Sequence, residues 1–330
     1  NTARVYKNET ETIDLDIQGF ENVTGGAGND VLVGNEKDNV LIGNAGNDIL
    51  IGKAGNDKLE GGVGNDRLEG GEGTKQYIFQ DNWGQDSIVF SAQTDKAIID
   101  FSQIQKNNIA VKVENGSVAS KFSLTIENDK NIEKDTIALV DFNHIEIAGS
   151  ETKETNLDFF KVTKALRFEI GKENVIVGED KAGAMYSLKA NRIHNLTGGK
   201  ADDTFKINTD GLLSGNLDGG QGTNVLEYVV VDEARKVNLS NQGTDAGKAQ
   251  GIEGIIINIH SLALGKGNDN VIGNNAGSIL SGNDGDDRLK GTSGYNILEG
   301  NAGNDTLIAG SGQDILIGGE GNDTLIAGAG

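Results

Sequence analysis

The sequence predicts an all-β fold in which short parallel strands stack into a coil, and three observations support it. A nine-residue period fills residues 25–78 and returns over 264–326 without gaps. Within each block glycine recurs at positions 1, 2 and 4, aspartate at position 6 and an aliphatic residue at position 8. Proline is absent, which suits short strands that are all paired. A fixed short period indicates stacked, nearly identical units.

Positions 7 to 9 of each block are expected to form a strand, and alternation sends position 8 to one face. Positions 1 to 6 must then reverse the chain, and glycine supplies the positive-φ conformations of a tight reversal. Two nine-residue blocks make one turn, so residues two blocks apart should lie above one another. The position 8 side chains would form a thin core between two parallel sheets. They are Leu32, Leu41, Leu50, Leu59, Leu68 and Tyr77, then Val271, Leu280, Leu289, Leu298, Leu307, Leu316 and Leu325.

The repeated block resembles the nonapeptide of the repeats-in-toxin (RTX) family, a glycine- and aspartate-rich calcium-binding signature. Blocks such as GGAGNDVLV at 25–33 and GGEGNDTLI at 318–326 carry the resemblance, and weaker relatives begin at Gly198 and Gly219. The resemblance implies right-handed parallel β-roll (β-solenoid) arrays that hold several Ca²⁺ ions. It also implies type I secretion from a bacterium, and therefore an extracellular or cell-surface location.

Position 6 distinguishes a calcium-rich edge from a calcium-poor edge in each array. Aspartates stacked at the strand spacing of about 4.8 Å repel each other unless a cation lies between them. Calcium prefers six to eight oxygens from carboxylates and backbone carbonyls. The predicted ligands of the calcium-rich edge are Asp30, Asp48 and Asp66, then Asp269, Asp287, Asp305 and Asp323, with the glycines Gly26, Gly28, Gly46, Gly64, Gly267, Gly285, Gly303 and Gly321. Full sites are expected between consecutive aspartates.

The calcium-poor edge carries Asn39, Asp57 and Lys75 in the first array and Ser278, Asn296 and Asp314 in the second. The Asn39/Asp57 and Asn296/Asp314 pairs are weaker candidates, because an amide oxygen brings no charge. Lys75 places its ammonium where an ion would sit, so the sequence predicts no ion between Asp57 and Lys75. The alternative for every one of these aspartates is a turn-capping role, as in Asx-turns.

The composition is consistent with calcium binding and restricts the classes of possible partners. The formal net charge is -21, from 50 acidic and 29 basic residues, which argues against nucleic acid as a partner. Cysteine is absent, so stability outside the cell must come from metal and stacking instead of disulfides. No apolar run approaches the length of a membrane span. Without cations, self-repulsion and 49 glycines should leave the arrays unfolded.

The sequence divides into five segments by pattern. Residues 1–24 are expected to be connector or entry strands, and 25–90 a first β-roll closed by an aromatic hairpin. Residues 91–190 form an irregular β region, 191–263 degenerate repeats and a connector, and 264–330 a second β-roll. Pattern alone does not decide whether 97–148 continues the coil or makes a small sandwich. Residues 157–170 fit a short helix or two strands.

No catalytic constellation is present in the sequence, which therefore predicts no enzyme. The histidines lack HExxH spacing, and there is neither a GxSxG elbow nor a cysteine nucleophile. Two functions remain. One is a calcium-stiffened structural or adhesive segment of an adhesin, surface layer or biofilm matrix filament. The alternative is the C-terminal export and folding module of a secreted toxin, protease or lipase with its catalytic domain elsewhere.

The ends and one outward-facing column complete the sequence picture. The last block stops at its fourth residue, so we expect a fragment of a larger exoprotein. Position 7 of the calcium-poor edge reads Ile279, Ile297 and Ile315. Such a column suits self-association, cover by the middle region or a cell-surface or matrix partner, and it equally suits ordinary β-propensity on a thin sheet.

Overall fold

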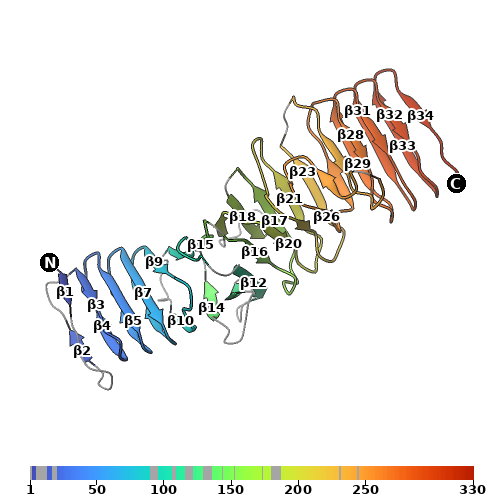
Figure 1. Ribbon diagram of the computed structural model, residues 1–330. Coiled ribbons are helices and arrows are strands. Elements are labelled where there is room, and N and C mark those ends of the chain that lie inside the picture. Colours follow the sequence, from blue (N-terminus) through green and yellow to red (C-terminus); the bar gives the residue numbers. More distant parts are fainter. Residues whose placement is uncertain are drawn as a thin grey trace. The chain divides into compact units, whose positions relative to one another are not determined.

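The computed structural model describes residues 2–4, 13–16, 21–89, 96–105, 109–115, 122–128, 136–142, 144–151, 153–172, 174–179, 187–229, 232–243 and 245–330. Much of the predicted entry segment, residues 1, 5–12 and 17–20, lies outside them. The chain splits into two compact units, Asn1–Asp158 with Met185–Arg192 and Phe159–Ala184 with Ile193–Gly330. The elements of both are strands joined by turns (Figure 1). The five-segment division of the sequence stays a proposal.

In the first unit two sheets face each other across the coil. One runs in the order β1 (Thr2–Arg4), β3 (Asn22–Thr24), β5 (Val40–Ala45), β7 (Asp57–Val63), β9 (Lys75–Ile78), β11 (Ala97–Asp100), β15 (His144–Ala148) and β19 (Ser187–Asn191). The other runs in the order β2 (Ile13–Asp16), β4 (Asp30–Val33), β6 (Ile49–Ile51), β8 (Arg67–Glu69), β10 (Gln85–Val89), β14 (Thr136–Phe142), β13 (Phe122–Asn128), β12 (Ile109–Asn115) and β16 (Thr155–Asp158). The strands of successive blocks of the first array alternate between these two sheets.

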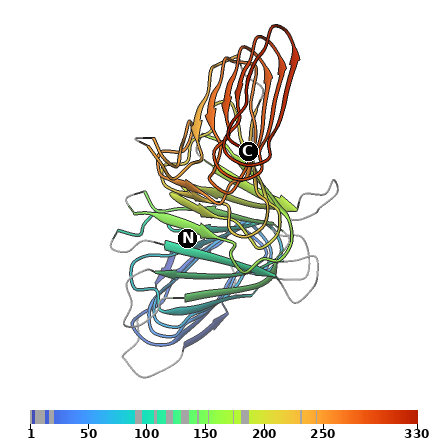
Figure 2. The same ribbon diagram turned by 90° about the vertical axis from the view of Figure 1, so that its right-hand side faces the viewer.

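The second unit repeats this plan. Its first sheet contains β18 (Asn174–Glu179), β17 (Leu166–Ile170), β21 (Thr204–Ile207), β23 (Val225–Tyr228), β27 (Ser261–Ala263), β29 (Ile279–Asp284), β31 (Ile297–Ala302) and β33 (Ile315–Glu320). A short second sheet holds β20 (Asn195–Thr197), β22 (Leu217–Asp218) and β26 (Ile256–Ile257). The third holds β25 (Lys248–Ala249), β24 (Lys236–Asn238), β28 (Asn270–Ile272), β30 (Arg288–Lys290), β32 (Thr306–Ile308) and β34 (Thr324–Ile326). Figure 2 shows the turns of 264–330 lying one behind another.

The register confirms that two blocks make one turn. Parallel partners within the arrays lie 18 residues apart, as in Asn39 above Asp57 and Asp48 above Asp66. The position 8 core is also confirmed: Leu41, Leu50, Leu59 and Leu68 are fully buried. Positions 7 and 9 alternate outward along the same strands. Nearest the C-terminal end of the sequence, Leu316 is half-buried and Leu325 is 49% exposed.

The predicted closing hairpin at the end of the first array is wrong. β9 pairs with β7 and β11 in one sheet, whereas β10 pairs with β8 and β14 in the other. The two strands therefore form the two halves of a further turn of the coil. Their connection buries Phe79 and Trp83, whose rings contact each other and Phe101. The aromatic residues fill the core as the position 8 leucines do elsewhere, and so the coil continues.

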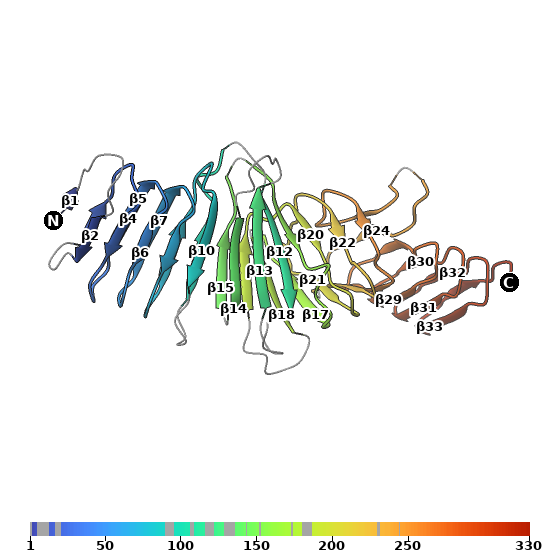
Figure 3. The same ribbon diagram turned by 90° about the horizontal axis from the view of Figure 1, so that it is seen from below.

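The described strands of the middle region lie in the two sheets of the coil, which is the first of the two arrangements that pattern left open. β11, β15 and β19 continue the coil as parallel strands of the first unit. On the opposite sheet β13 pairs antiparallel with both β12 and β14, as Figure 3 shows. Residues 157–170 form the end of β16 and the strand β17, with a turn between them, and no helix.

Candidate metal centre

A ladder of backbone-to-carboxylate hydrogen bonds joins the aspartates of the calcium-rich edge. The N–H of Asp30 donates to Oδ1 of Asp48 at 2.7 Å, and the N–H of Asp48 donates to Oδ1 of Asp66 at 2.7 Å. The second array repeats the pattern, with Asp287 N–H donating to Oδ1 of Asp305 at 2.7 Å. The same bond joins Asp269 to Asp287 and Asp305 to Asp323. The structure thus brings together every aspartate pair predicted for this edge.

The second carboxylate oxygen is buried in five of these aspartates. Asp48 is 1% exposed, and its Oδ2 has no hydrogen-bond partner among the described residues. The same holds for the Oδ2 atoms of Asp66, Asp269, Asp287 and Asp305. Burying an ionised carboxylate without compensation is very unfavourable. Each of these oxygens therefore needs a cation or a proton.

The raised pKa values of these aspartates also indicate that their ionised forms need a compensating charge. Burial raises the pKa of the Asp48 and Asp287 carboxyls to about 7. Burial also raises the pKa of Asp66 and Asp269 to about 6. In Asp48 and Asp287 the neighbouring aspartates of the column add to the increase, because like charges disfavour ionisation. A divalent ion between the turns would offset both effects, because an opposite charge favours the ionised carboxylate.

Glycines at position 1 let a carbonyl oxygen approach each carboxylate. A Cβ on Gly43 would collide with Oδ2 of Asp48 and with the carbonyl oxygen of Gly61 in the next turn. A Cβ on Gly300 would likewise collide with Oδ2 of Asp305 and with the carbonyl oxygen of Gly318. Carboxylate and carbonyl oxygens converge here, and these are the ligand types that Ca²⁺ prefers.

Glycines at position 4 stack in a second column of the calcium-rich edge. Gly46 and Gly64 have φ values of 125° and 147°, which side chains rarely adopt. A Cβ on Gly64 would collide with the carbonyl oxygen of Gly46, so this carbonyl is directed at the next turn. Gly285, Gly303 and Gly321 repeat the arrangement in the second array. Position 4 therefore contributes a carbonyl oxygen between turns.

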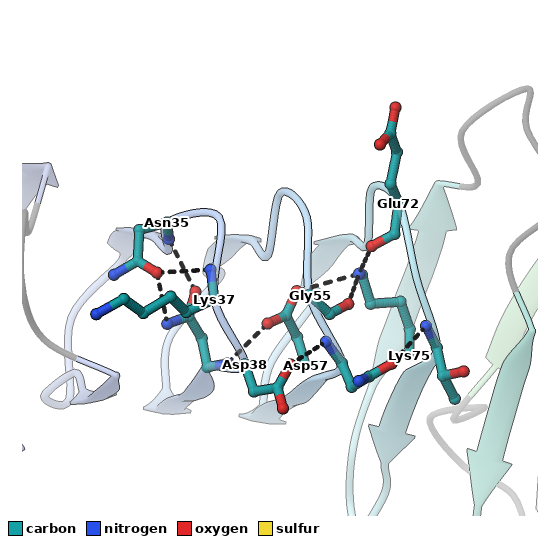
Figure 4. A network of polar contacts seen from close by, with 10 residues as sticks. Asn35, Lys37, Asp38, Gly55, Asp57, Glu72 and Lys75 are labelled. Carbon is teal, nitrogen blue, oxygen red and sulfur yellow. Dashed lines mark hydrogen bonds and ion pairs between the residues drawn. The ribbon is translucent and has the colours of Figure 1, made fainter.

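Lys75 marks where a cation lies between two turns. Its side chain is buried, and its Nζ lies 3.2 Å from Oδ2 of Asp57 (Figure 4). The same ammonium donates to the carbonyl oxygens of Gly55, at 2.6 Å, and of Glu72. A cation is thus held by the position 6 carboxylate and position 4 carbonyl of one turn and by the position 3 carbonyl of the next. In the described ranges, no ammonium takes this place beside the Oδ2 atoms of the calcium-rich edge, and their oxygens fit Ca²⁺.

The remaining calcium-poor pairs are joined through amide groups. Asn39 N–H donates to Oδ1 of Asp57 at 2.8 Å. Asn296 donates to Oδ1 of Asp314 from both its backbone N–H, at 3.0 Å, and its Nδ2, at 2.9 Å. Ser278 N–H donates to Oδ1 of Asn296 at 3.0 Å. The amide donor of Asn296 thus supplies part of the positive potential that a metal would supply on the other edge.

Comparison with known proteins agrees with this geometry. The RTX calcium-binding nonapeptide repeat (4 copies) matches residues 24–59, 42–74, 264–298, 281–316 and 299–330. Residues 24–74 and 264–330 of this chain are therefore arrays of RTX calcium-binding nonapeptide repeats. RTX nonapeptide repeats bind several calcium ions per array, and the RTX family is typical of type I secreted extracellular bacterial proteins. No curated protein matches the chain. Within the described residues, no helix is long and apolar enough to cross a membrane.

The position 6 columns of the calcium-rich edge also contain two residues that were not predicted from the sequence. Asp86 continues the calcium-rich column, because Asp66 N–H donates to its Oδ1 at 2.8 Å. Arg235 precedes Asp269 in the aspartate column of the second array, and its N–H lies 2.5 Å from Oδ1 of Asp269. Its guanidinium is buried against the Tyr228 ring, 5.2 Å from the centroid. The signal for Asp86 was GQDSI at 84–88, which keeps glycine, aspartate and an aliphatic residue at positions 4, 6 and 8. Arg235 lies in a segment without such a signal.

Asp203 occupies position 6 of the degenerate block that begins at Gly198. Its Oδ2 accepts a hydrogen bond from Gly199 N–H at 2.6 Å, and its Oδ1 accepts one from Leu166 N–H at 2.8 Å. The next position 6 residue is Asn224, whose Oδ1 accepts a hydrogen bond from Asp203 N–H at 2.9 Å. The degenerate turns therefore keep the ladder, but backbone donors hold the carboxylate.

Proposed function

We propose that this chain is an extracellular structural or adhesive segment that folds and stiffens when calcium binds after type I secretion. The ions would lie between consecutive turns of the calcium-rich edge, at Asp30/Asp48, Asp48/Asp66, Asp269/Asp287, Asp287/Asp305 and Asp305/Asp323. The ligands of each site would be the two aspartates, with the position 3 and position 4 carbonyls. Asn39/Asp57 and Asn296/Asp314 would be weaker sites.

The observation that carries this proposal is the column of buried Oδ2 atoms that lack a donor among the described residues. In a low-calcium cytosol, repulsion along these columns favours the extended chain that secretion needs. Outside the cell, each ion lies between two carboxylates, some of which are shared with the next site, and ties two turns together. Extracellular calcium modules typically bind with dissociation constants of about 10⁻⁴ to 10⁻³ M. Binding would thus coincide with export.

The structural role is supported by the strands outside the arrays. β11, β15 and β19 stack on β9 in the first unit, and β23 and β27 continue into β29 in the second. Each unit therefore extends its coil with turns that lie outside the two nonapeptide arrays. A load-bearing segment needs such continuity, because each turn of a solenoid contacts only its neighbours.

Circular dichroism and small-angle X-ray scattering of the purified chain test the proposal together. With millimolar calcium we expect β structure and a stiff, narrow particle, and with excess chelator an expanded coil. Magnesium serves as the control, because its octahedral geometry and strong hydration suit these sites poorly. Unchanged β content in chelator would refute the proposal. Calcium-driven folding to a flexible particle would favour the alternative function, the export and folding module.

A further inference from the structure

The aromatic connection after the first array forms a turn that matches the calcium-binding turns in all but length. β7 and β9 keep the 18-residue register, with Leu59 beside Tyr77. β8 and β10 pair with a 20-residue offset, with Leu68 beside Ile88. Two extra residues are therefore accommodated between these pairings, inside the loop. Residues 79–89 form this turn, which we call the aromatic turn.

The second half of the aromatic turn takes up the positions of a nonapeptide. Gly84 has a φ of 85°, and a Cβ there would collide with the carbonyl oxygen of Gly64, as a Cβ on Gly64 would with that of Gly46. Gln85 N–H donates to Oδ1 of Asn65 at 2.9 Å, which continues the position 5 ladder of the array. Asp86 is 5% exposed and Ile88 is buried, as expected for positions 6 and 8. Trp83 consequently stands at position 3.

The oxygens expected around a cation are therefore present between Asp66 and this turn. Lys75 shows that a cation takes a position 6 carboxylate and a position 4 carbonyl from one turn and a position 3 carbonyl from the next. The corresponding groups here are the Asp66 carboxylate, the Gly64 carbonyl and the Trp83 carbonyl. Asp66 is 2% exposed, and its Oδ2 has no hydrogen-bond partner among the described residues. That Oδ2 lies beside the bare Cα of Gly61, as Oδ2 of Asp48 lies beside Gly43.

We propose that Asp66 and Asp86 hold a further calcium ion between the last nonapeptide turn and the aromatic turn. The second half of this site, Trp83 and Asp86, lies beyond residue 74, where the RTX match of the first array ends. The ion would fasten the turn that packs Phe79 and Trp83 into the core. It would thus couple calcium binding in the array to the ordering of the strands that follow. The inference rests on the proposed calcium sites of the array.

The chain contains one tryptophan, so its emission reports on this turn alone. Trp83 is 2% exposed and packs against Phe79 and Phe101. The test variant is Asp86→Asn, which keeps an oxygen for the Asp66 N–H and removes the charge. The matched control is Asp30→Asn, at the opposite end of the same column and far along the coil from Trp83. Full-length chains are used throughout.

Equilibrium dialysis against calcium should show one ion fewer per chain for both variants. Terbium, which replaces calcium in oxygen sites, should give tryptophan-sensitised luminescence in the unaltered chain. Asp86→Asn should lose most of this emission and Asp30→Asn should keep it. Circular dichroism in saturating calcium verifies that each variant is folded. If Asp86→Asn does not fold, the terbium luminescence of the unaltered chain still tests the site. Trp83→Phe, which removes the sensitising tryptophan, is then the control.

The outcomes separate this inference from the proposed function. If Asp86→Asn is folded and binds as many ions as the unaltered chain, the further site is wrong while the array sites stand. Absence of sensitised emission in the unaltered chain, with terbium bound at the array, also overturns it. If neither calcium binding nor calcium-dependent folding is seen at all, the proposed function itself fails.

Discussion

The two edges of the first array share one backbone and differ in the source of positive charge between their turns. On the calcium-rich edge, Asp48 and Asp66 present buried Oδ2 atoms with no hydrogen-bond partner in the part of the chain that the structure describes. On the calcium-poor edge, the ammonium of Lys75 contacts Asp57 and two backbone carbonyls. The comparison teaches that the coil itself creates a cation position between turns. We propose that the residue at position 6 determines whether a metal ion or a side chain occupies this position.

The largest expected effect comes from the middle of the calcium-rich edge. Asp48→Asn keeps the acceptor for Asp30 N–H and removes a charge shared by two proposed sites. With calcium about a hundredfold above the dissociation constant, each site contributes about 2.7 kcal/mol, so the free energy of unfolding should fall by about 5 kcal/mol. Urea unfolding in calcium measures it, with Asp210→Asn on an exposed turn as the control. Equal effects of both variants would contradict the proposed sites.

Removing the internal cation should have the next largest effect. Lys75→Met leaves the Asp57 carboxylate buried without its partner, and breaking such a pair costs about 3 kcal/mol or more. Lys58→Met, on the exposed face of β7, is the control. Both are compared by urea unfolding in calcium.

The reverse substitution sharpens the same comparison. Lys75→Asp converts the pair into the type found on the calcium-rich edge, so the variant should bind one more calcium ion than the unaltered chain. Equilibrium dialysis measures the difference, and Lys58→Asp controls for the change in net charge. An unchanged number of ions would show that position 6 alone does not determine the edge.

Acid should weaken calcium binding at the calcium-rich edge. The pKa of Asp48 is about 7 in the metal-free fold, above the value of about 3.9 expected in the unfolded chain. The metal-free fold therefore binds more protons than the unfolded chain in this window, and its stability falls as pH rises through it. Calcium needs the carboxylate, so protons compete with it. Each pH unit below the pKa should weaken binding about tenfold per carboxylate, or about 1.4 kcal/mol.

Calcium titrations followed by circular dichroism at about pH 5 and about pH 8 measure this competition. The midpoint should move to higher calcium in acid. The metal-free chain should also retain more β structure in acid than at neutral pH. A midpoint that does not depend on pH would mean that these carboxylates do not bind the ion.

The smallest effect is expected where the two edges are alike. Asn47 and Asn56, both at position 5, accept hydrogen bonds from the N–H groups of Asn65 and Thr74 in the following turns. Asn47→Ala and Asn56→Ala should each cost about 1 kcal/mol, because each removes one exposed hydrogen bond. Urea unfolding in calcium should give equal losses on the two edges. A larger loss for Asn47→Ala would indicate that position 5 also supports metal binding.

The sequence was sufficient for those features that repeat at a fixed interval. The buried leucines of position 8 and the contact of Asp30 with Asp48 follow from a nine-residue period alone. Asp86 was missed because two added residues shift it out of that period. Arg235 was missed because its position beside Asp269 depends on the path of the connector. The antiparallel position of β13 could not be predicted, since parallel and antiparallel strands show the same alternation.

The two residues added between Phe79 and Trp83 leave the pairing of β8 with β10 intact. Extra length is accommodated in the loop, so the stack on either side is preserved. Foreign peptides could therefore be grafted at this point of the chain and displayed along the coil. Their presentation would then be controlled by the calcium concentration of the medium.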